Sequence, residues 1–395
     1  MGEVVRIKRE RRVGTLRAPA TRPVRVLAVD LLRGLAVMGM VMVAYAGGWD
    51  HRFTFLTHAD WRGFAIADMI FPAFLFCAGA ALPHALRRRE TQGRAALVLH
   101  VGRRAAALVA LGILLNLLPG FDVAHVRLPG ILQRIGLCYA IAGTGCVLVS
   151  RRDGPPVTAL VMAMIVLLAG YAALLLAWAA PDCGRACFDS AHALPTVVDR
   201  AVFGVAHLWP WGRTGDVVTY DPEGLVSTLG ALVNMLLGVT ASVLLMRSHK
   251  PATLTALAIA GVGCLLIGFL LDPLVPMVKK LWTPSFALAS GGFSLLALLT
   301  LIRLVPPGTE VPAWARPVLA FGTNATLAFV GITLIDTAMQ LPLGSIGSGH
   351  DLLAGMLARL IPEARVASAV YSALLLGVLG TGLWQLYRRR IVIRI

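Results

Sequence analysis

The sequence predicts an all-α integral membrane protein, a polytopic bundle of about ten transmembrane helices with both termini in the cytoplasm. The chain is 57% hydrophobic and only 14% charged, whereas a soluble domain carries roughly 25% charged residues. Long apolar runs recur from one end of the chain to the other. Because lipid offers no partner for backbone polar groups, such runs are expected to be helices.

Apolar stretches of roughly 20 residues, the length that crosses a bilayer, occupy residues 26–47, 63–86, 96–118, 129–150, 157–180, 225–246, 252–271, 284–304, 317–340 and 366–387. Basic residues gather at alternate junctions, namely the N-terminus and residues 87–94, 151–152, 247–250, 303–316 and 388–390. Cytoplasmic loops are enriched in Lys and Arg, so these junctions and both termini are placed inside.

Charge patterning also suggests the domain boundaries and the cellular location. We expect residues 1–25 to form a disordered basic cytoplasmic arm without a cleavable signal peptide, and residues 26–390 to form a single transmembrane domain. Positive cytoplasmic loops account for the net charge of +16 better than binding of nucleic acid does. Few of the basic residues are Lys, which favours a GC-rich bacterial genome and hence a multi-pass protein of the bacterial inner membrane.

The longest loop, near residues 181–224, falls outside the cytoplasm and carries several aromatic residues. Loops of this length are usually functional, and their Trp and Tyr suit either sugar stacking or the aromatic belt of a membrane interface. Cys183 and Cys187 share the loop, where a disulfide could persist. No metal site is expected, because two Cys without a nearby His pair make a poor zinc shell.

Charged residues inside or beside the spans are candidates for function, because inserting each one into the membrane costs on the order of 3 kcal/mol of free energy. Asp30 and Arg33 lie three residues apart on one helical face and can pair with each other or shape a site. Lys279 and Lys280 fall on the outer side, against the positive-inside rule, which indicates a re-entrant or site-lining segment.

The most informative local block is HADWRGFAIADMIFP, residues 58–72. A His at a membrane boundary can take a proton near neutral pH when a carboxylate orients it. Asp60 and Asp68 are both candidates for that carboxylate. A His in a loop is more often simply solvated, so the residues alone leave both interpretations open.

Two further clusters carry charge into the spans. Gln133 and Arg134 enter the fourth span together, after Arg127, and a buried Arg needs an anionic partner, either a protein carboxylate or a phosphate. Glu223 stands with Asp221 at the start of the sixth span, where helix capping and function are equally good explanations. Asn324, in the ninth span, is either an interhelical hydrogen-bonding residue or part of a site.

Six blocks in order resemble the heparan-α-glucosaminide N-acetyltransferase family of transmembrane acyltransferases. They are VDLLRGLAVMGMVMV (29–43), HADWRG with ADMIFPAFLF (58–76), VRLPGILQRIGLCY (126–139), DPEGLVSTL (221–229), KKLWTPSFALASGG (279–292) and GTNATLAFVG (322–331). The resemblance covers nearly the whole predicted membrane domain. Each block alone is only moderately specific, but six in the same order are a strong signal.

The resemblance implies transfer of an acetyl group from cytosolic acetyl-CoA to the amine of an extracytoplasmic amino sugar or glycan, in a protein that is a possible homodimer. It implies His58 and Asp68 as catalytic residues. The expected acetyl-CoA-binding residues are Arg127, Gln133, Arg134, Lys279 and Lys280. The expected substrate-binding residues are Asp30, Arg33, Trp61, Glu223 and Asn324.

Two positions depart from the family pattern. Ala44 stands where relatives have an active-site Asn, and Ile332 stands where they have a His. Losing one hydrogen-bond donor to an oxyanion costs roughly 2.7–4 kcal/mol of transition-state stabilisation. Two alternatives therefore stay open beside the enzyme, an amino-sugar or oligosaccharide permease and a catalytically retired membrane scaffold.

Overall fold

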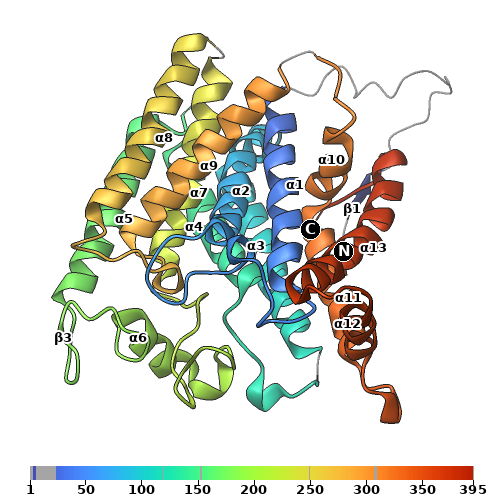
Figure 1. Ribbon diagram of the computed structural model, residues 1–395. Coiled ribbons are helices and arrows are strands. Elements are labelled where there is room, and N and C mark those ends of the chain that lie inside the picture. The colour runs from blue at the N-terminus through green and yellow to red at the C-terminus, as the bar shows by residue number, and fades with distance from the viewer. Residues whose placement is uncertain are drawn as a thin grey trace. The chain divides into compact units, whose positions relative to one another are not determined.

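The computed structural model describes residues 3–5, 24–118, 120–151, 154–248, 250–306 and 309–394. Within them, nine helices are long and apolar enough to cross a membrane, and ten if one bent pair counts as a single span. The predicted all-α polytopic membrane bundle is confirmed (Figure 1).

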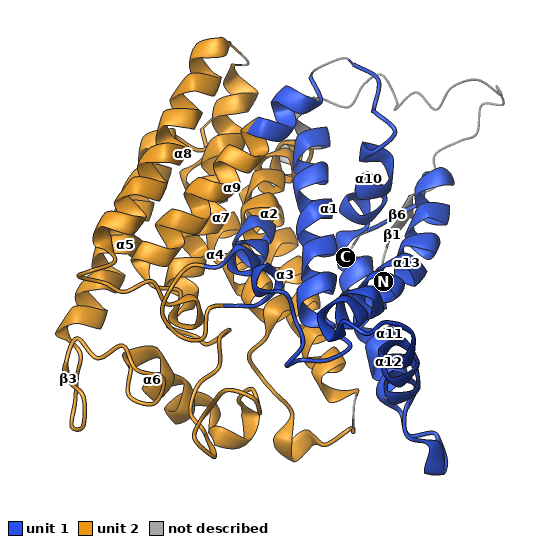
Figure 2. Cartoon of the chain, in the orientation of Figure 1, with its two compact units in different colours: residues 1–58, 65–74, 300–395 blue, residues 59–64, 75–299 orange. Residues whose placement is uncertain are grey.

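Contacts divide the chain into two compact units, coloured separately in Figure 2. Unit 1 comprises Met1–His58, Ala65–Phe74 and Thr300–Ile395, and unit 2 comprises Ala59–Phe64 and Leu75–Leu299. Helix α2 (Ile70–Arg87) contributes its first residues to unit 1 and the rest to unit 2.

Unit 1 is built on α1 (Val24–Ala44), which packs along α10 (Ala315–Thr323). The two backbones approach so closely that a Cβ added at Gly322 would lie 1.8 Å from the carbonyl oxygen of Asp30. Small residues at helix interfaces permit such approaches in membrane proteins. The remaining helices are α11 (Ala325–Gln340), α12 (Gly349–Leu360) and α13 (Ala364–Arg388). Helices α10 and α11 together match the predicted ninth span, but an 85° bend separates them.

The two ends of the chain meet in unit 1. Strand β1 (Glu3–Val5) pairs antiparallel with β6 (Val392–Arg394). Both ends therefore lie on the same side of the bundle, in agreement with the prediction that they share a compartment. The rest of the predicted basic arm, residues 1–2 and 6–23, lies outside the described residues.

Unit 2 has the buried helix α7 at its centre. Its spanning helices are α3 (Arg94–Leu117), α4 (Ile131–Val149), α5 (Val157–Ala177), α7 (Thr228–Arg247), α8 (Pro251–Leu271) and α9 (Pro284–Leu304). The apolar window of α7 is 78% buried, whereas those of α5 and α8 are 22% and 17% buried. Such apolar but exposed helices need lipid around them, so α5 and α8 form the lipid-facing side of unit 2.

The long loop of unit 2 folds against one end of these helices and contains α6 (Leu194–Phe203) (Figure 1). Two short hairpins flank α6, β2–β3 (Ala179–Ala180 and Gly184–Arg185) and β4–β5 (Arg213–Thr214 and Val217–Val218). A disulfide between Cys183 and Cys187 closes the first hairpin. Short 3-10 turns complete the described chain at η1 (Thr54–Leu56), η2 (Ile66–Met69), η3 (Glu90–Gln92), η4 (Val123–His125), η5 (Val205–His207), η6 (Lys279–Leu281) and η7 (Gly344–Ile346).

Candidate active site

His58 and Asp68 form a hydrogen-bonded pair within unit 1. Asp68 lies in η2, its side chain is fully buried, and its Oδ2 accepts a hydrogen bond from the Ala65 N–H at 3.1 Å. Its Oδ1 lies 2.8 Å from His58 Nδ1, and the His58 side chain is 38% exposed. A carboxylate only accepts, so this bond places the ring proton on Nδ1 and the lone pair on Nε2. Of the two candidate carboxylates, Asp68 therefore orients the imidazole.

Asp30 and Arg33 pair with each other, as the helical spacing indicated. Arg33 Nε also donates to the carbonyl of Gly322 at 2.7 Å. The pair thereby ties α1 to α10 inside unit 1. The contacts show a structural role, and the predicted role in substrate binding stays a prediction.

Asn324 lies at the bend between α10 and α11 and is 1% exposed. Its Nδ2 donates to the carbonyl of Ile391 at 3.1 Å, and its Oδ1 accepts from the N–H of Ile393 at 2.9 Å. Both ends of the amide therefore bind the C-terminal segment. These contacts do not favour the substrate-binding role predicted for Asn324, which stays a prediction.

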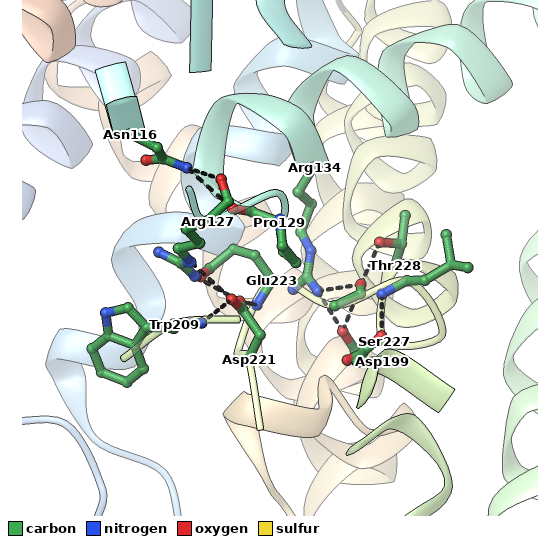
Figure 3. Close-up of polar contacts among 12 residues, drawn as sticks. Asn116, Arg127, Pro129, Arg134, Asp199, Trp209, Asp221, Glu223, Ser227 and Thr228 are labelled. Atoms are coloured by element: carbon green, nitrogen blue, oxygen red, sulfur yellow. Dashed lines mark hydrogen bonds and ion pairs between the residues drawn. The ribbon is translucent and has the colours of Figure 1, made fainter. Parts of the chain in front are cut away.

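An ionic cluster of Arg127, Asp221 and Glu223 lies at the end of unit 2 where α4 and α7 begin (Figure 3). Arg127 donates to Asp221 through Nε at 2.8 Å and Nη2 at 2.6 Å, and Nη2 also reaches Glu223. Burial opposes the charge on Arg127, but the two carboxylates outweigh it and raise the pKa of the guanidinium. Of the two partners that the sequence allowed for Arg127, the structure supplies carboxylates.

Arg134, one turn into α4, is completely buried. Its Nη2 donates to the carbonyl of Gly224 at 2.9 Å and to the hydroxyl of Ser227 (Figure 3). Its guanidinium lies over the Trp282 ring, 5.0 Å from the centroid. Nε and Nη1 have no hydrogen-bond partner among the described residues. A buried cation with two unused N–H directions is suited to an acceptor oxygen from outside the protein.

Gln133 adds another buried donor beside Arg134. It is 6% exposed, its side-chain oxygen lies against Gly112 of α3, and its Nε2 has no partner within the described chain. Unused buried donors on successive residues are uncommon, because each costs about 1–3 kcal/mol when left unpaired. Among the residues predicted to bind acetyl-CoA, Gln133 and Arg134 thus keep N–H groups that can donate hydrogen bonds to a ligand.

Asp199 is a buried carboxyl group beside Arg134 that was not among the residues predicted from the sequence. It is 1% exposed, and its Oδ1 accepts from the N–H of Leu225 at 2.8 Å. A Cβ at Gly224 would fall 1.7 Å from its Oδ2, so only glycine fits there. Burial raises the pKa of Asp199 to about 7, although the Leu225 N–H and the Arg134 charge act to lower it. In the sequence, Asp199 beside Arg200 resembles a solvated pair on a loop helix, and no motif marks it.

Lys280 and Trp61 lie together in unit 2. Lys280 Nζ donates to the backbone carbonyl of Asp60 and lies 5.5 Å from the Trp61 ring centroid and 5.8 Å from that of Tyr220. Trp61 Nε1 donates to the carbonyl of Phe188 at 2.7 Å, which holds the ring in place. Lys280 is therefore anchored among aromatic rings and the outer loop, with Lys279 next to it in η6. The role of Lys279 and Lys280 in binding acetyl-CoA stays a prediction.

The two departures from the family pattern lie in unit 1 and differ in their surroundings. Ala44 is exposed at the last position of α1. Ile332 is fully buried in the apolar core that also contains Tyr371 and Leu375. A polar side chain is therefore easily accommodated at residue 44 and costly at residue 332.

Comparison with known proteins finds a matching family model and similar curated proteins. Residues 25–188 match the family model described as heparan-alpha-glucosaminide N-acetyltransferase, catalytic. The heparan-alpha-glucosaminide N-acetyltransferase of Homo sapiens is 27% identical, with 78% of this chain and 53% of that protein covered. That of Mus musculus is 26% identical, with 79% and 54% covered. The chain thus spans about half the length of the curated relatives it matches. The matched segment contains both the His58–Asp68 pair and Arg134, and over most of its length the chain is similar to these heparan-alpha-glucosaminide N-acetyltransferases.

Proposed function

We propose that this chain is a multi-pass membrane N-acetyltransferase that moves an acetyl group from acetyl-CoA to the amine of an amino sugar or glycan. The observation that carries the proposal is the His58–Asp68 hydrogen bond of 2.8 Å, in a chain related to proteins named as N-acetyltransferases. The donor is taken from the cytoplasm and the acceptor from the far side of a bacterial inner membrane. The basic loops and the disulfide-closed hairpin support this sidedness.

The orientation of His58 suits the proton transfer that amide formation requires. With its proton on Nδ1 held by Asp68, the ring presents a basic lone pair at Nε2. The acceptor nitrogen attacks the thioester carbonyl, Nε2 takes a proton from that nitrogen, the C–S bond breaks, and CoA leaves as the thiol once its sulfur is protonated. A route through an acetyl-His58 intermediate uses the same lone pair.

Asp68 is a positioning residue in this mechanism. Its burial and its second hydrogen bond, from the Ala65 N–H, keep the carboxylate in one orientation. It also stabilises the imidazolium that forms when Nε2 is protonated.

We propose that Arg134 and Gln133 bind oxygen atoms of acetyl-CoA that accept hydrogen bonds. Arg134 Nε and Nη1 and Gln133 Nε2 are buried N–H donors without partners among the described residues. Phosphate and carbonyl oxygens match such donors. Arg127 is ion-paired with Asp221 and Glu223 through Nε and Nη2, and this pairing favours a role in holding the loop around Arg134 over contact with acetyl-CoA.

The test is His58→Ala in the full chain reconstituted in liposomes that enclose labelled acetyl-CoA, with an amino sugar outside. We expect transfer to fall by 10²-fold or more, the order expected for loss of a general base. His125→Ala is the matched control, because His125 also pairs with a carboxylate, Asp122 at 2.7 Å, but both side chains are largely exposed. Undiminished transfer by His58→Ala would refute the proposed role.

The response to acetyl-CoA distinguishes a permease from an acyltransferase. Acetyl-CoA should raise the melting temperature of the acyltransferase, because a ligand that binds the folded state stabilises it. Arg134→Gln should lower that response while His58→Ala retains it. A chain that transports amino sugars but shows no stabilisation by acetyl-CoA would be a permease.

A further inference from the structure

A cavity lies in unit 2, at the end of the helices opposite α6. Its volume is about 300 Å³, and its lining consists of Arg151, Gly154, Pro156, Val157, Thr158 and Arg247. These residues belong to the loop between α4 and α5, the first turn of α5 and the last turn of α7. Pockets that hold small ligands begin near this size.

The described lining residues carry charge of one sign. Their ionisable side chains, Arg151 and Arg247, are both guanidinium groups, and no described carboxylate lines the cavity. Neither Arg forms an ion pair with any residue that the structure describes. Within that same part of the chain, the Arg151 side chain makes no hydrogen bond. The neighbouring Arg152 and Asp153 lie outside the described residues.

The loop that forms the cavity is held from two sides. Arg247 Nη2 donates to the carbonyl of Pro155, and Arg94 Nη2 donates to that of Ser150, both at 3.2 Å. Arg151 and Gly154 also hydrogen-bond each other through their backbones. Arg247 uses one nitrogen in this way, which fixes its guanidinium at the cavity while its other N–H groups keep their donor capacity.

The first turn of α5 adds donors of the same kind. The 21-residue helix begins at Val157 after Pro156, and no side chain caps its N-terminus. The uncapped N–H groups and the positive end of the helix dipole lie at residues 156–158, which line the cavity. Guanidinium groups together with a helix N-terminus are the typical setting for a phosphate group.

We propose that this cavity binds a phosphate ester at the cytoplasmic surface, such as the headgroup of an anionic phospholipid. Arg247 and Arg151 share the anionic oxygens, and the N–H groups of Val157 and Thr158 donate to them. The basic ends of α5 and α7 place the cavity at the level of lipid headgroups, where basic pockets between helices bind anionic lipids. The same chemistry would accept a soluble phosphate, so the experiment separates the two sources.

The test uses the purified full chain in detergent, titrated with short-chain phosphatidylglycerol, short-chain phosphatidylcholine or inorganic phosphate. The melting temperature and the bound lipid counted by native mass spectrometry are the readouts. We expect phosphatidylglycerol, but not phosphatidylcholine, to stabilise the wild type. Arg151→Gln/Arg247→Gln should weaken apparent binding by roughly tenfold or more. The control Arg87→Gln/Arg88→Gln removes equal charge from exposed residues outside the cavity and should bind like the wild type.

Stabilisation by inorganic phosphate that is lost in the double variant would support the site and assign it to a soluble ligand. Equal responses of the wild type and the double variant to every ligand would overturn the proposal. If the double variant fails to fold, Arg151→Gln alone decides the question, because its exposed side chain supports no described hydrogen bond. None of these readouts depends on acetyl transfer.

Discussion

Replacing Arg127 by Met tests whether this residue holds the fold or binds the donor. Asp221 is 2% exposed and Arg127 retains 19% side-chain exposure, so the change leaves a buried carboxylate without its partner. Removing one member of a buried ion pair costs about 3–5 kcal/mol. Because Arg127 is partly exposed, we expect the lower end, a loss of about 3 kcal/mol in the free energy of unfolding.

A double-mutant cycle assigns that loss to the pair. Asp221→Asn removes the charge but keeps an oxygen that can accept a hydrogen bond from the Trp209 N–H, as Asp221 Oδ2 does at 2.9 Å. We expect Arg127→Met/Asp221→Asn to be more stable than the sum of the single changes predicts, with a coupling energy of about 1–3 kcal/mol.

The free energy of unfolding is measured by titration with SDS in mixed micelles, followed by Trp fluorescence. Arg213→Met is the control, because Arg213 is exposed and its Nε donates to the carbonyl of Pro210. Its effect should stay within about 0.5 kcal/mol. If Arg127→Met were as stable as this control and had lost only its response to acetyl-CoA, the structural role assigned to Arg127 would be wrong.

Three further changes test other parts of the molecule. The pKa of Asp199, raised to about 7 by burial, makes the folded state bind more protons than the unfolded state between about pH 4 and pH 7. The free energy of unfolding should therefore fall across that range as pH rises, by up to about 1.4 kcal/mol per pH unit. In SDS titrations Asp199→Asn should flatten this slope, whereas Asp216→Asn, at an exposed residue, should not. Ala44→Asn should raise the initial rate of acetyl transfer by tenfold or more if an amide there stabilises the oxyanion, whereas Ala44→Leu should not, and equal rates would exclude that role. Gly322→Ala should lower the melting temperature measurably, because its Cβ would lie 1.8 Å from the Asp30 carbonyl oxygen, whereas Gly382→Ala, with nothing within 4 Å, should not.

The spans could be predicted from the sequence because hydrophobic length and loop charge are local properties. Every predicted span corresponds to a helix or, for the ninth, to the bent pair α10–α11. The bend itself was not predicted. It occurs at Asn324, whose amide exchanges hydrogen bonds with residues 391 and 393, and such distant partners leave no local pattern.

The candidate site was only partly predictable for the same reason. Asp68 lies ten residues after His58, and the short separation made the pair a reasonable hypothesis. The partners of Arg127 lie 94 and 96 residues away, and the sequence could state only that an anion was needed. Asp199 becomes unusual only through burial against Gly224, which its own neighbours in the sequence do not indicate.

The pairing of β1 with β6 also constrains how many times the chain crosses the bilayer. Two chain ends that pair as β-strands occupy one compartment, which requires an even number of crossings, and the described residues contain nine regular spanning helices, an odd number. Among the described residues, the bent α10–α11 pair with its 85° angle is the candidate for a tenth crossing. Reporter domains fused to either end should consequently give identical signals for sidedness.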